Sequence, residues 1–273
     1  KHFGDYSQFE KVNVTGAQQI VNFCTAFKSK MNHVSTISVS GDFFKQKHKY
    51  MTFSEDDFYI GQDFDQNVYV ESKFIAEKIV FEAMDKGMDA SIYRVGNLTG
   101  RHVDGHFQIN MDENRFYNIL KSIILLGVVP RRMLESNMEF TPVDCCSKAL
   151  VRLAGTKDSC GEVFHLYNPK KLKMKALLNV FNDLGITIKK MDNDFFRKHI
   201  NQVLNKRKGN KLVSGIINDI SGGNASSFYP TVEVNSEITQ EYLNQVGFDW
   251  PDIDFDYLKK IVRYMNEKGF LEK

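Results

Sequence analysis

A tyrosine and a lysine four residues apart, Tyr69 and Lys73, are the residues of this sequence best suited to act together in chemistry. On a helix, this spacing places the phenol and the ammonium on one face. A neighbouring cation lowers the pKa of a phenol from about 10, which makes it a usable proton donor to a carbonyl oxygen under reduction. Thr36 supplies a hydroxyl that can hydrogen-bond the same oxygen as negative charge develops on it. We therefore predict that Thr36, Tyr69 and Lys73 form a catalytic set for carbonyl reduction.

The position of the Tyr–Lys pair matters, because the spacing itself is common. The sequence contains four Tyr-x-x-x-Lys matches, which begin at Tyr69, Tyr117, Tyr167 and Tyr264. The match at Tyr69 opens an expected helix that follows a strand ending in two hydroxyls, Ser35 and Thr36. It also precedes a strand that ends in a turn containing Gly96. A solvent-exposed pair without function is the alternative for each match, and this context favours chemistry at Tyr69.

The apolar pattern predicts an α/β chain that becomes helical toward its end. Helical spacing covers residues 13–28 and 69–86, and β-prone runs cover residues 33–39 and 90–95. Strand, loop, helix and strand in this order are typical of a parallel βαβ unit. Residues 101–139 break this alternation and include an expected helix over 114–126. The alternation then returns with a strand at 139–143, a helix over 144–154 whose N-cap is Asp144, and a strand at 162–166. Helices are then predicted over residues 174–184, 193–205 and 254–268.

Composition excludes several classes of protein. The 273 residues are 42% hydrophobic and 26% charged, which is ordinary for a globular chain and excludes disorder. The longest apolar stretch, residues 119–129, contains Lys121 and is much shorter than the roughly 20 residues of a membrane span. The four cysteines show no metal-binding spacing, so we predict no metal and a reduced chain. We therefore expect a cytoplasmic protein that does not contact membranes.

The net charge of +2 hides an uneven distribution along the chain. Residues 165–215 hold 12 Lys or Arg against 3 Asp or Glu, whereas residues 216–273 hold 5 against 10. The basic residues are Lys170, Lys171, Lys173, Lys175, Lys189, Lys190, Arg197, Lys198, Lys206, Arg207, Lys208 and Lys211. Such a segment attracts an acidic partner or a phosphate, although a solvated lysine-rich helix face explains it equally well. Nucleic acid is disfavoured because aromatic residues for base stacking are sparse there.

Two further polar features are interpreted as structural. His33 lies beside a strand, and we expect it to be packed or at the surface rather than to act as a base. An acidic stretch is expected to be a solvated loop and not a calcium site, because its carboxylates lack a tight alternating pattern. It contains Glu55, Asp56, Asp57, Asp63 and Asp65.

Several motifs together resemble those of the extended short-chain dehydrogenase/reductases. They are Val34-Ser-Thr-Ile-Ser-Val, Gly61-Gln, Tyr69-Val-Glu-Ser-Lys-Phe-Ile-Ala-Glu, Tyr93-Arg-Val-Gly-Asn-Leu-Thr-Gly-Arg, Phe140-Thr-Pro-Val-Asp, Gly247-Phe-Asp-Trp-Pro-Asp and Glu267-Lys-Gly-Phe-Leu. More narrowly, the sequence is similar to the terminal thioester reductase domains of nonribosomal peptide synthetases. The similarity covers essentially the whole chain, is densest over residues 31–168 and is weak over residues 170–240.

The resemblance implies roles for individual residues and a division into domains. Thr36, Tyr69 and Lys73 would be the catalytic triad, and Tyr69 and Lys73 would also bind the cofactor, with Lys73 on the nicotinamide ribose. Gly96, Asn97 and Leu98 would lie beside the nicotinamide. Residues 1–100 and 139–169 would be the remainder of a Rossmann-like NADPH-binding domain with a partial parallel sheet. Residues 101–138 and 170–273 would form a mainly helical subdomain that binds substrate and carrier protein.

The resemblance also implies a reaction and a partner. In such domains, NADPH reduces a peptidyl or acyl thioester held on the phosphopantetheine arm of a carrier protein and releases an aldehyde or, in some members, an alcohol. Apolar residues of the second subdomain, part of them plain core, would line the acyl pocket: Phe107, Phe116, Ile119, Leu120 and Ile123. The chain would be a monomeric domain of a multidomain synthetase. The alternatives are another extended reductase, such as a fatty acyl-CoA reductase or a nucleotide-sugar enzyme, and a carrier-protein docking module without catalysis.

The sequence departs from the family pattern in one respect. The family binds the cofactor pyrophosphate at a glycine-rich turn after its first strand, and none of the 18 glycines is arranged as G-x-G-x-x-G. Tyr69 also comes earlier than a complete Rossmann half would place it. We therefore expect an N-terminally truncated fragment that binds NADPH weakly or not at all and is inactive by itself.

Overall fold

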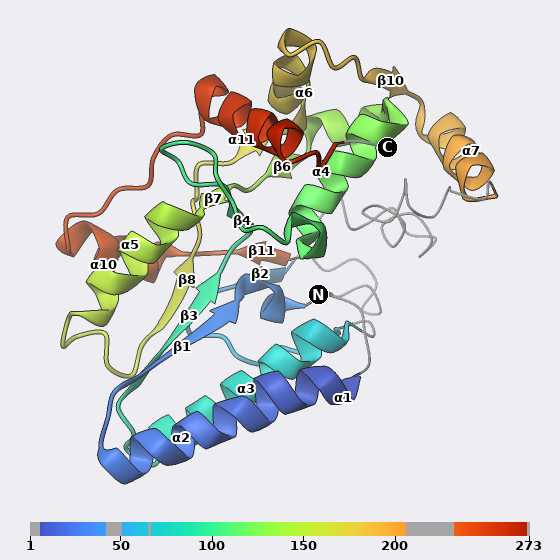
Figure 1. The fold of residues 1–273 in the computed structure, drawn as a ribbon. Helices are drawn as coiled ribbons and strands as arrows, with labels where there is room; N and C mark the ends of the chain where they lie inside the picture. The colour runs from blue at the N-terminus through green and yellow to red at the C-terminus, as the bar shows by residue number, and fades with distance from the viewer. Residues whose placement is uncertain (1–5, 42–50, 65–66, 206–231, 272–273) are drawn as a thin grey trace. The chain divides into compact units, whose positions relative to one another are not determined.

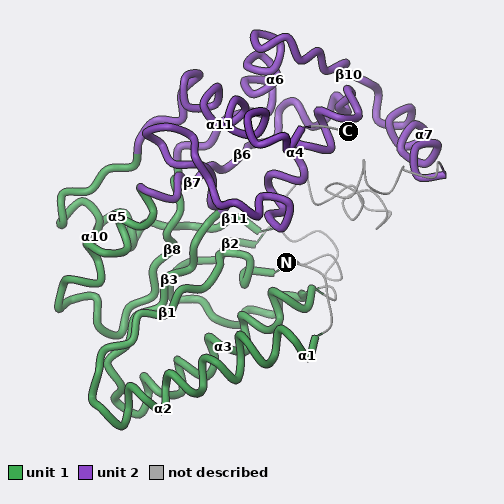
Figure 2. Tube along the Cα trace, viewed as in Figure 1, with its two compact units in different colours: residues 1–96, 145–169, 231–250 green, residues 97–144, 170–230, 251–273 purple. Residues whose placement is uncertain are grey.

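The chain folds into two compact units, each assembled from separate stretches of sequence (Figure 2). The computed structural model describes residues 6–41, 51–64, 67–205 and 232–271. Unit 1 comprises residues 1–96, 145–169 and 231–250, and unit 2 comprises residues 97–144, 170–230 and 251–273. Among the described residues, no helix is both long and apolar enough to cross a membrane.

Unit 1 contains a parallel sheet with the strand order β1-β3-β8 (Figure 1). The strands are β1 (Met31–Thr36), β3 (Ala90–Val95) and β8 (Val163–Leu166). Met31 lies opposite Ala90 and Ile92 lies opposite Val163, and both pairings are parallel. Every residue of β3 is buried, as expected of a central strand covered on both faces. The predicted α/β fold with a parallel sheet is confirmed.

Helices cover both faces of this sheet (Figure 1). On one face lie α2 (Gly16–Phe27), which follows α1 (Tyr6–Phe9) and the π-helical turn η1 (Glu10–Thr15), and α3 (Val68–Met84). On the other face lie α5 (Val143–Ala154) and α10 (Glu237–Gln245). The core between the first pair of helices and the sheet includes Val21, Val80 and Ile92. The predicted helices at 13–28 and 69–86 are therefore present with small shifts at their ends.

Residues 231–250 belong to unit 1, whereas the sequence predicted the second subdomain for all of residues 170–273. Strand β11 (Val232–Val234) pairs in parallel with β2 (Met51–Phe53). Close by, the buried Glu55 carboxylate accepts hydrogen bonds from the Thr239 amide at 2.9 Å and from its hydroxyl at 2.7 Å. The expectation of a solvated acidic loop is therefore wrong at Glu55, because this carboxylate joins two distant stretches of the chain.

Unit 2 is mainly helical. Its helices are α4 (Arg115–Leu126), α6 (Met174–Asp183), α7 (Asn193–Leu204) and α11 (Phe255–Glu267), with 3-10 turns η3 (Met111–Glu113) and η4 (Arg131–Glu135). The described residues of the unit also form short strand pairs: β4 (Leu98–Thr99) with β7 (Thr141–Pro142), β5 (Val128–Pro130) with β10 (Lys189–Met191), and β6 (Asn137–Met138) with β9 (Leu172–Lys173). Tyr117, Leu120, Phe181, Tyr257 and Met265 lie in its core.

The structure explains two of the differences at element ends. Strand β1 ends at Thr36, because the Thr36 side chain accepts a hydrogen bond from the Ser38 amide and starts the 3-10 turn η2 (Ile37–Ser40). Helix α5 begins at Val143, so Asp144 lies in its first turn instead of capping it. The Asp144 carboxylate accepts from the His102 amide at 2.8 Å.

Candidate active site

The end of β1 and the first turn of α3 bring Thr36 and Tyr69 together in unit 1. Thr36 is the last residue of its strand, and its hydroxyl is hydrogen-bonded to the Tyr69 phenol. The start of α3 is fixed by Asn67, whose side chain accepts from the Val70 amide at 3.3 Å. The Phe9 ring packs edge-on against Tyr69 with 6.2 Å between centroids. Local capping and packing therefore hold the phenol at the carboxyl end of β1.

Lys73 lies one turn further along α3 and also reaches β1. Its Nζ donates a hydrogen bond to the Val34 carbonyl oxygen at 2.6 Å. Because Val34 is two residues before Thr36, the structure places all three predicted catalytic residues at the same end of this strand. Their roles in catalysis remain a prediction.

The electrostatics of Tyr69 differ from the expectation. Burial raises the pKa of Tyr69, and the hydrogen bond with Thr36 offsets part of that rise. Burial also lowers the pKa of Lys73, while the nearby Glu77 carboxylate acts in the opposite direction. The expected lowering of the Tyr69 pKa is therefore not seen, because the cost of burying a charged phenolate dominates.

The other three Tyr-x-x-x-Lys tyrosines hydrogen-bond to backbone groups. The Tyr117 phenol oxygen accepts from the Gly100 amide at 2.8 Å. Tyr167 donates to the Val234 carbonyl at 2.7 Å, and Tyr264 donates to the Phe107 carbonyl at 2.8 Å. These three phenols hold chain segments in place, which agrees with the choice of Tyr69 from its context.

The predicted nicotinamide-contacting residues lie where the chain leaves the sheet. Gly96 is the last residue of this stretch in unit 1, and its amide donates to the Leu166 carbonyl at 3.2 Å. Asn97 and Leu98 belong to unit 2, where Leu98 pairs with Thr141. The Asn97 carbonyl accepts from the Thr141 amide at 3.0 Å.

Sequence reasoning missed Glu139, which holds this turn from the other side. Its carboxylate accepts from the Asn97 amide at 2.6 Å and from the Thr141 hydroxyl. Burial raises the pKa of Glu139 to about 7, although these two hydrogen bonds and the charge of Lys171 oppose the rise. The signal in the sequence was a single carboxylate at the start of the apolar run Glu139-Phe-Thr-Pro-Val.

Sequence reasoning also missed a buried ion pair beneath α3. Arg94, on the central strand, donates to the Glu77 carboxylate through Nε and Nη2 at 3.0–3.3 Å, and both side chains are fully buried. Arg94 Nη1 also donates to the Asp57 carbonyl at 2.8 Å and lies 3.1 Å from His165 Nε2. A charged residue inside an otherwise apolar strand, Ser91-Ile-Tyr-Arg-Val, was the signal for this cluster.

The donor groups at the end of β1 fit one end of a nicotinamide cofactor. A hydroxyl, a phenol and an ammonium supply hydrogen bonds for a carbonyl and a ribose. Within the described part of the chain, β1 runs into η2 and not into a glycine-rich turn before a helix, so no pyrophosphate cradle follows this strand. The described residues that follow β1 therefore fit the reactive end of the cofactor and supply no cradle for its pyrophosphate.

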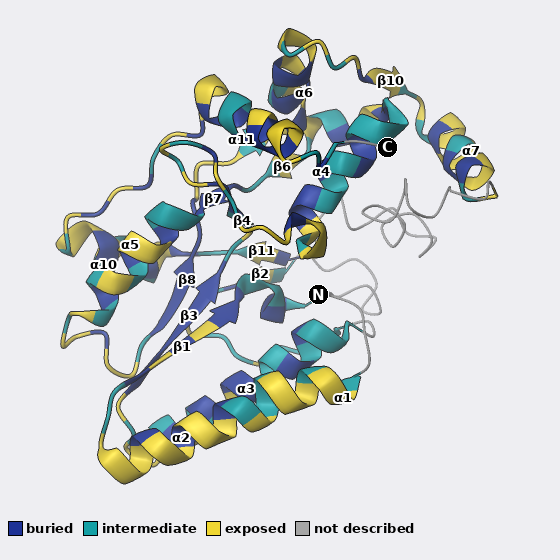
Figure 3. Cartoon of the chain, viewed as in Figure 1, coloured by how far each residue is buried: buried dark blue, intermediate teal, exposed yellow. Residues whose placement is uncertain are grey.

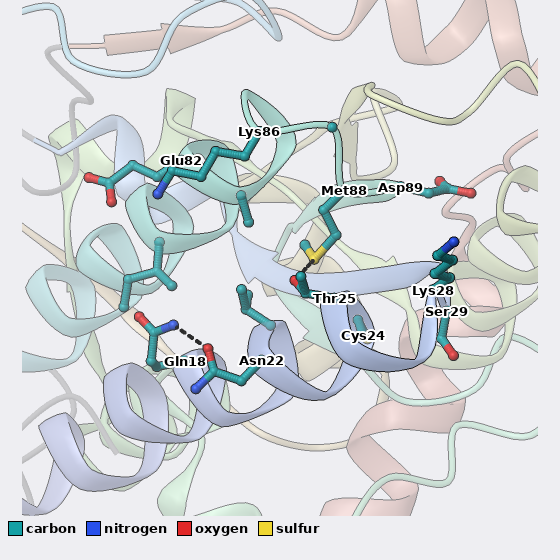
Figure 4. Close-up of a pocket in the computed structure, with 14 residues that line it drawn as sticks. Gln18, Asn22, Cys24, Thr25, Lys28, Ser29, Glu82, Lys86, Met88 and Asp89 are labelled. Carbon is teal, nitrogen blue, oxygen red and sulfur yellow. Dashed lines mark hydrogen bonds between the residues drawn. The ribbon is translucent and has the colours of Figure 1, made fainter.

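One cavity of unit 1 lies elsewhere. It has a volume of about 530 Å³ and lies between α2 and α3 (Figure 4). Its walls include Gln18, Asn22, Lys28, Glu82 and Lys86, and none of Thr36, Tyr69 and Lys73 lines it. This cavity is therefore separate from the predicted catalytic residues.

The residues predicted to line an acyl pocket pack into unit 2. Phe116, Leu120 and Ile123 are buried in its core, and Phe107 and Ile119 pack against that core while partly buried. The first three are therefore core residues of this unit. No cluster of metal-ligating side chains occurs among the described residues, and none of the four cysteines forms a disulfide.

The basic segment is divided between ion pairs and exposed side chains. Lys170 pairs with Asp252 at 2.8 Å, and Lys175 pairs with Glu135 at 3.2 Å. Lys189 and Lys190 are exposed on β10. Four of its basic residues lie outside the described residues: Lys206, Arg207, Lys208 and Lys211. Lys189 and Lys190 are thus among the described cations that remain accessible to a partner.

Comparison with known proteins identifies the family. Residues 1–150 match the model of an NAD-binding family described as male sterility protein. The chain belongs to this family. It is also similar to solved reductase domains over its whole length, so the predicted membership in the extended short-chain dehydrogenase/reductases is confirmed.

Three relatives illustrate the similarity. A linear gramicidin synthase polypeptide of Brevibacillus parabrevis is 26% identical over 97% of this chain, which spans 5% of that polypeptide. A thiolation-reductase di-domain from an archaeal nonribosomal peptide synthetase is 32% identical with a TM-score of 0.85, and the whole of this chain covers 56% of it. The terminal R domain of the myxalamid pathway is 25% identical with a TM-score of 0.84, and the whole of this chain covers 67% of it.

Proposed function

We propose that this chain is the catalytic and substrate-binding part of a thioester reductase that releases a carrier-bound peptidyl or acyl group as an aldehyde. The observation that carries the proposal is the hydrogen-bonded pair Thr36–Tyr69 at the carboxyl end of β1, with Lys73 one turn away. The similarity of the full chain to reductase domains of peptide synthetases supports the same conclusion.

In the proposed reaction, the chain stabilises charge on the thioester oxygen. The Tyr69 phenol donates a proton to that oxygen as negative charge develops, and the Thr36 hydroxyl donates a second hydrogen bond. The raised pKa of Tyr69 keeps the phenol protonated until the reaction begins. The resulting hemithioacetal collapses to the aldehyde and the free thiol of the carrier arm, and a second reduction would give the alcohol.

Several residues are proposed to hold the cofactor. NADPH supplies a hydride when bound. Lys73 would contact its ribose, and the backbone of Gly96, Asn97 and Leu98 would lie beside the nicotinamide. Glu139 would keep that turn in place through its hydrogen bond with the Asn97 amide.

The proposed substrate is attached to a carrier protein, and the exposed lysines of unit 2 are candidates to contact it. Carrier proteins present a phosphate on the pantetheine arm, which lysines attract. Because Lys170 and Lys175 already pair with carboxylates, Lys189 and Lys190 are the better candidates. Reversing both charges should weaken carrier binding. Reversing Lys78 on α3 and Lys86 in the turn that follows this helix, which are also exposed, should leave it unchanged.

The deciding experiment compares substrates on the longest natural protein that contains this chain. We expect a carrier-bound acyl thioester to be reduced with NADPH much faster than the same acyl group on CoA. We expect Tyr69→Phe to lower that rate by about 10²–10⁴-fold. Equal turnover of the two substrates would show that the reaction is not specific for a carrier protein, and would favour an acyl-CoA reductase.

A carrier-docking module without catalysis is the second candidate. The observation that favours it is the strand β1 leading into η2 without a glycine-rich turn. In that case, carrier binding would depend on Lys189 and Lys190, while Tyr69→Phe would leave carrier binding unchanged and no reductase activity would be found to lose.

A further inference from the structure

One residue of unit 2, Gly100, has both of its backbone groups held by buried tyrosines of two different helices. The Gly100 amide donates to the phenol oxygen of Tyr117 on α4 at 2.8 Å. The phenol of Tyr257 on α11 donates to the Gly100 carbonyl at 2.7 Å. Because the Tyr257 hydrogen is used in that bond, the Thr99 hydroxyl, 2.7 Å from the same phenol oxygen, is the donor to it.

The two phenols add direction to the core of unit 2 and not merely volume. Tyr117 and Tyr257 are both fully buried, and α4 and α11 each carry buried and exposed residues (Figure 3). Phenylalanine would fill nearly the same space without the cost of burying a hydroxyl. A buried hydroxyl with a satisfied partner fixes the position of that partner. The pair therefore specifies where Gly100 lies.

Helix α11 also holds the far end of the loop that leaves Gly100. Tyr264 is seven residues after Tyr257, so it lies on the same face of the helix two turns further along. Its phenol donates to the Phe107 carbonyl at 2.8 Å. The two tyrosines of α11 therefore hold the loop over residues 100–107 at its two ends with hydrogen bonds of almost equal length.

The middle of this loop packs directly on the backbone of α11. Gly105 has φ +76°, and a Cβ on it would lie 2.5 Å from the Lys260 carbonyl carbon. A Cβ on Gly100 would overlap the Gly105 carbonyl oxygen. The Lys260 ammonium donates to the His102 carbonyl at 3.2 Å. Because of this close contact, the position of the loop follows the position of the helix.

Gly100 comes directly after the segment that is proposed to lie beside the nicotinamide. Asn97 is held by the Glu139 carboxylate, and Leu98 and Thr99 form strand β4. A strand of two residues makes too few ladder bonds to fix its own position. The tyrosines on Gly100 supply a second anchor at the end opposite to Glu139.

We propose that Tyr117 and Tyr257 are positioning residues for the cofactor, because they fix Gly100 and with it the backbone of Asn97 and Leu98. The identity of the cofactor in this inference rests on the proposed function. Each tyrosine acts through Gly100 and not by contact with the reacting atoms.

The kinetic test compares phenylalanine variants of the longest natural protein that contains this chain. Tyr257→Phe removes the donor to the Gly100 carbonyl, and Tyr117→Phe removes the acceptor of its amide. We expect each to raise the KM for NADPH about 5-fold, which is the effect of losing one buried hydrogen bond. Because both act on the same residue, the double variant should raise the KM by less than the product of the two single effects.

Tyr264→Phe is the matched control. It removes a hydrogen bond of almost the same length from the same helix, at the end of the loop far from Gly100, and should leave the KM for NADPH unchanged. General loss of folded protein would lower kcat in all three single variants without changing the KM. An unchanged KM in Tyr257→Phe, or an equal rise in Tyr264→Phe, would overturn the proposal.

Hydrogen exchange tests the same inference without turnover. Tyr117→Phe and Tyr257→Phe should each speed exchange of the amides of residues 97–100 about 10-fold, whereas Tyr264→Phe should not. NADPH should slow exchange of these amides in the unchanged protein. Thioester reduction without this protection would overturn the positioning role alone. Protection by NADPH without thioester reduction would overturn the proposed function alone.

Discussion

Glu139 illustrates how a single carboxyl can hold a turn and carry a proton. It accepts hydrogen bonds from the Asn97 amide and the Thr141 hydroxyl, yet burial raises its pKa to about 7. A carboxyl whose folded pKa exceeds its unfolded value contributes most stability when protonated. That contribution is complete below about pH 4.5 and is lost as the pH rises through 7.

We therefore predict that unit 2 becomes less stable between pH 5 and pH 8, by about 2 kcal/mol. Glu139→Gln keeps an acceptor for the Asn97 amide and cannot ionise, so it should remove this dependence. Hydrogen exchange of the α4 and α11 amides at several pH values measures the effect. An equally steep dependence in the variant would contradict the assignment to Glu139.

At the residue scale, spacing and context identified Thr36, Tyr69 and Lys73, and the structure brings them to one end of β1. The partner of Lys73 was not predictable, because it depends on which edge of the sheet is covered. The raised pKa of Tyr69 follows from burial, which a sequence pattern does not reveal.

Strand β3 and helix α3 are joined by an ion pair that has no contact with solvent. Arg94 holds Glu77 with two nitrogens and fixes the Asp57 carbonyl with a third. Glu77 is one turn from Lys73 and two turns from Tyr69 on the same helix. The pair therefore sets the position of the helix that carries two of the predicted catalytic residues.

Replacing one residue of the Arg94–Glu77 ion pair should destabilise the fold far more than replacing both residues. Arg94→Met leaves the Glu77 carboxylate buried and unpaired, and we expect it to lower the free energy of unfolding by about 3–5 kcal/mol. Combining it with Glu77→Leu should recover a large part of that loss. Urea denaturation followed by the fluorescence of Trp250, the single tryptophan, measures both variants. Equal losses in the single and double variants would show that the ion pair is not responsible.

Elements with strong periodicity were predicted well, whereas short ones were not. Helices α3, α4, α6 and α7 follow from apolar residues at helical spacing. Strands β2 and β11 have three residues each and pair with one another although they are 181 positions apart in the sequence. Helix α10 was not predicted because its sequence is mostly polar. It is held in place by the hydrogen bond that the Thr239 hydroxyl donates to Glu55, which is distant in the sequence.

The two units are expected to respond to pH in opposite directions. In unit 1, burial lowers the pKa of His33 to about 4 and that of His165 to about 3, with Lys73 and Arg94 as the respective charged neighbours. A histidine with a lowered folded pKa contributes stability above its unfolded value of 6.5, and this is lost as the pH falls. Unit 2 behaves oppositely because of Glu139.

We predict that unit 1 loses up to about 5 kcal/mol between pH 7 and pH 4.5 from these two histidines. His33→Gln should remove about half of that loss and cost little at pH 7, since His33 Nε2 makes no hydrogen bond. Trp250 fluorescence during unfolding reports on unit 1. If the His33→Gln variant loses as much stability in acid as the unchanged protein, His33 does not contribute to that loss.

For residues 1–273 alone, we predict weak NADPH binding. The Thr36, Tyr69 and Lys73 side chains offer contacts to the nicotinamide end, and the sequence has no glycine-rich turn for the pyrophosphate. Titration followed by cofactor fluorescence should give a Kd above the micromolar range. Micromolar binding would contradict this prediction, and NADH in parallel would show whether the 2′-phosphate contributes.

Each unit combines stretches from distant parts of the sequence, which delays its folding during synthesis. Neither unit is one continuous stretch, and Glu55 meets a residue 184 positions later in the sequence. A ribosome adds about 5–20 residues per second, so β2 and the Glu55 carboxylate wait on the order of 10–40 s for their partners to emerge. A nascent chain that stops before residue 231 lacks the partners of both, so we expect holding chaperones to bind it during synthesis.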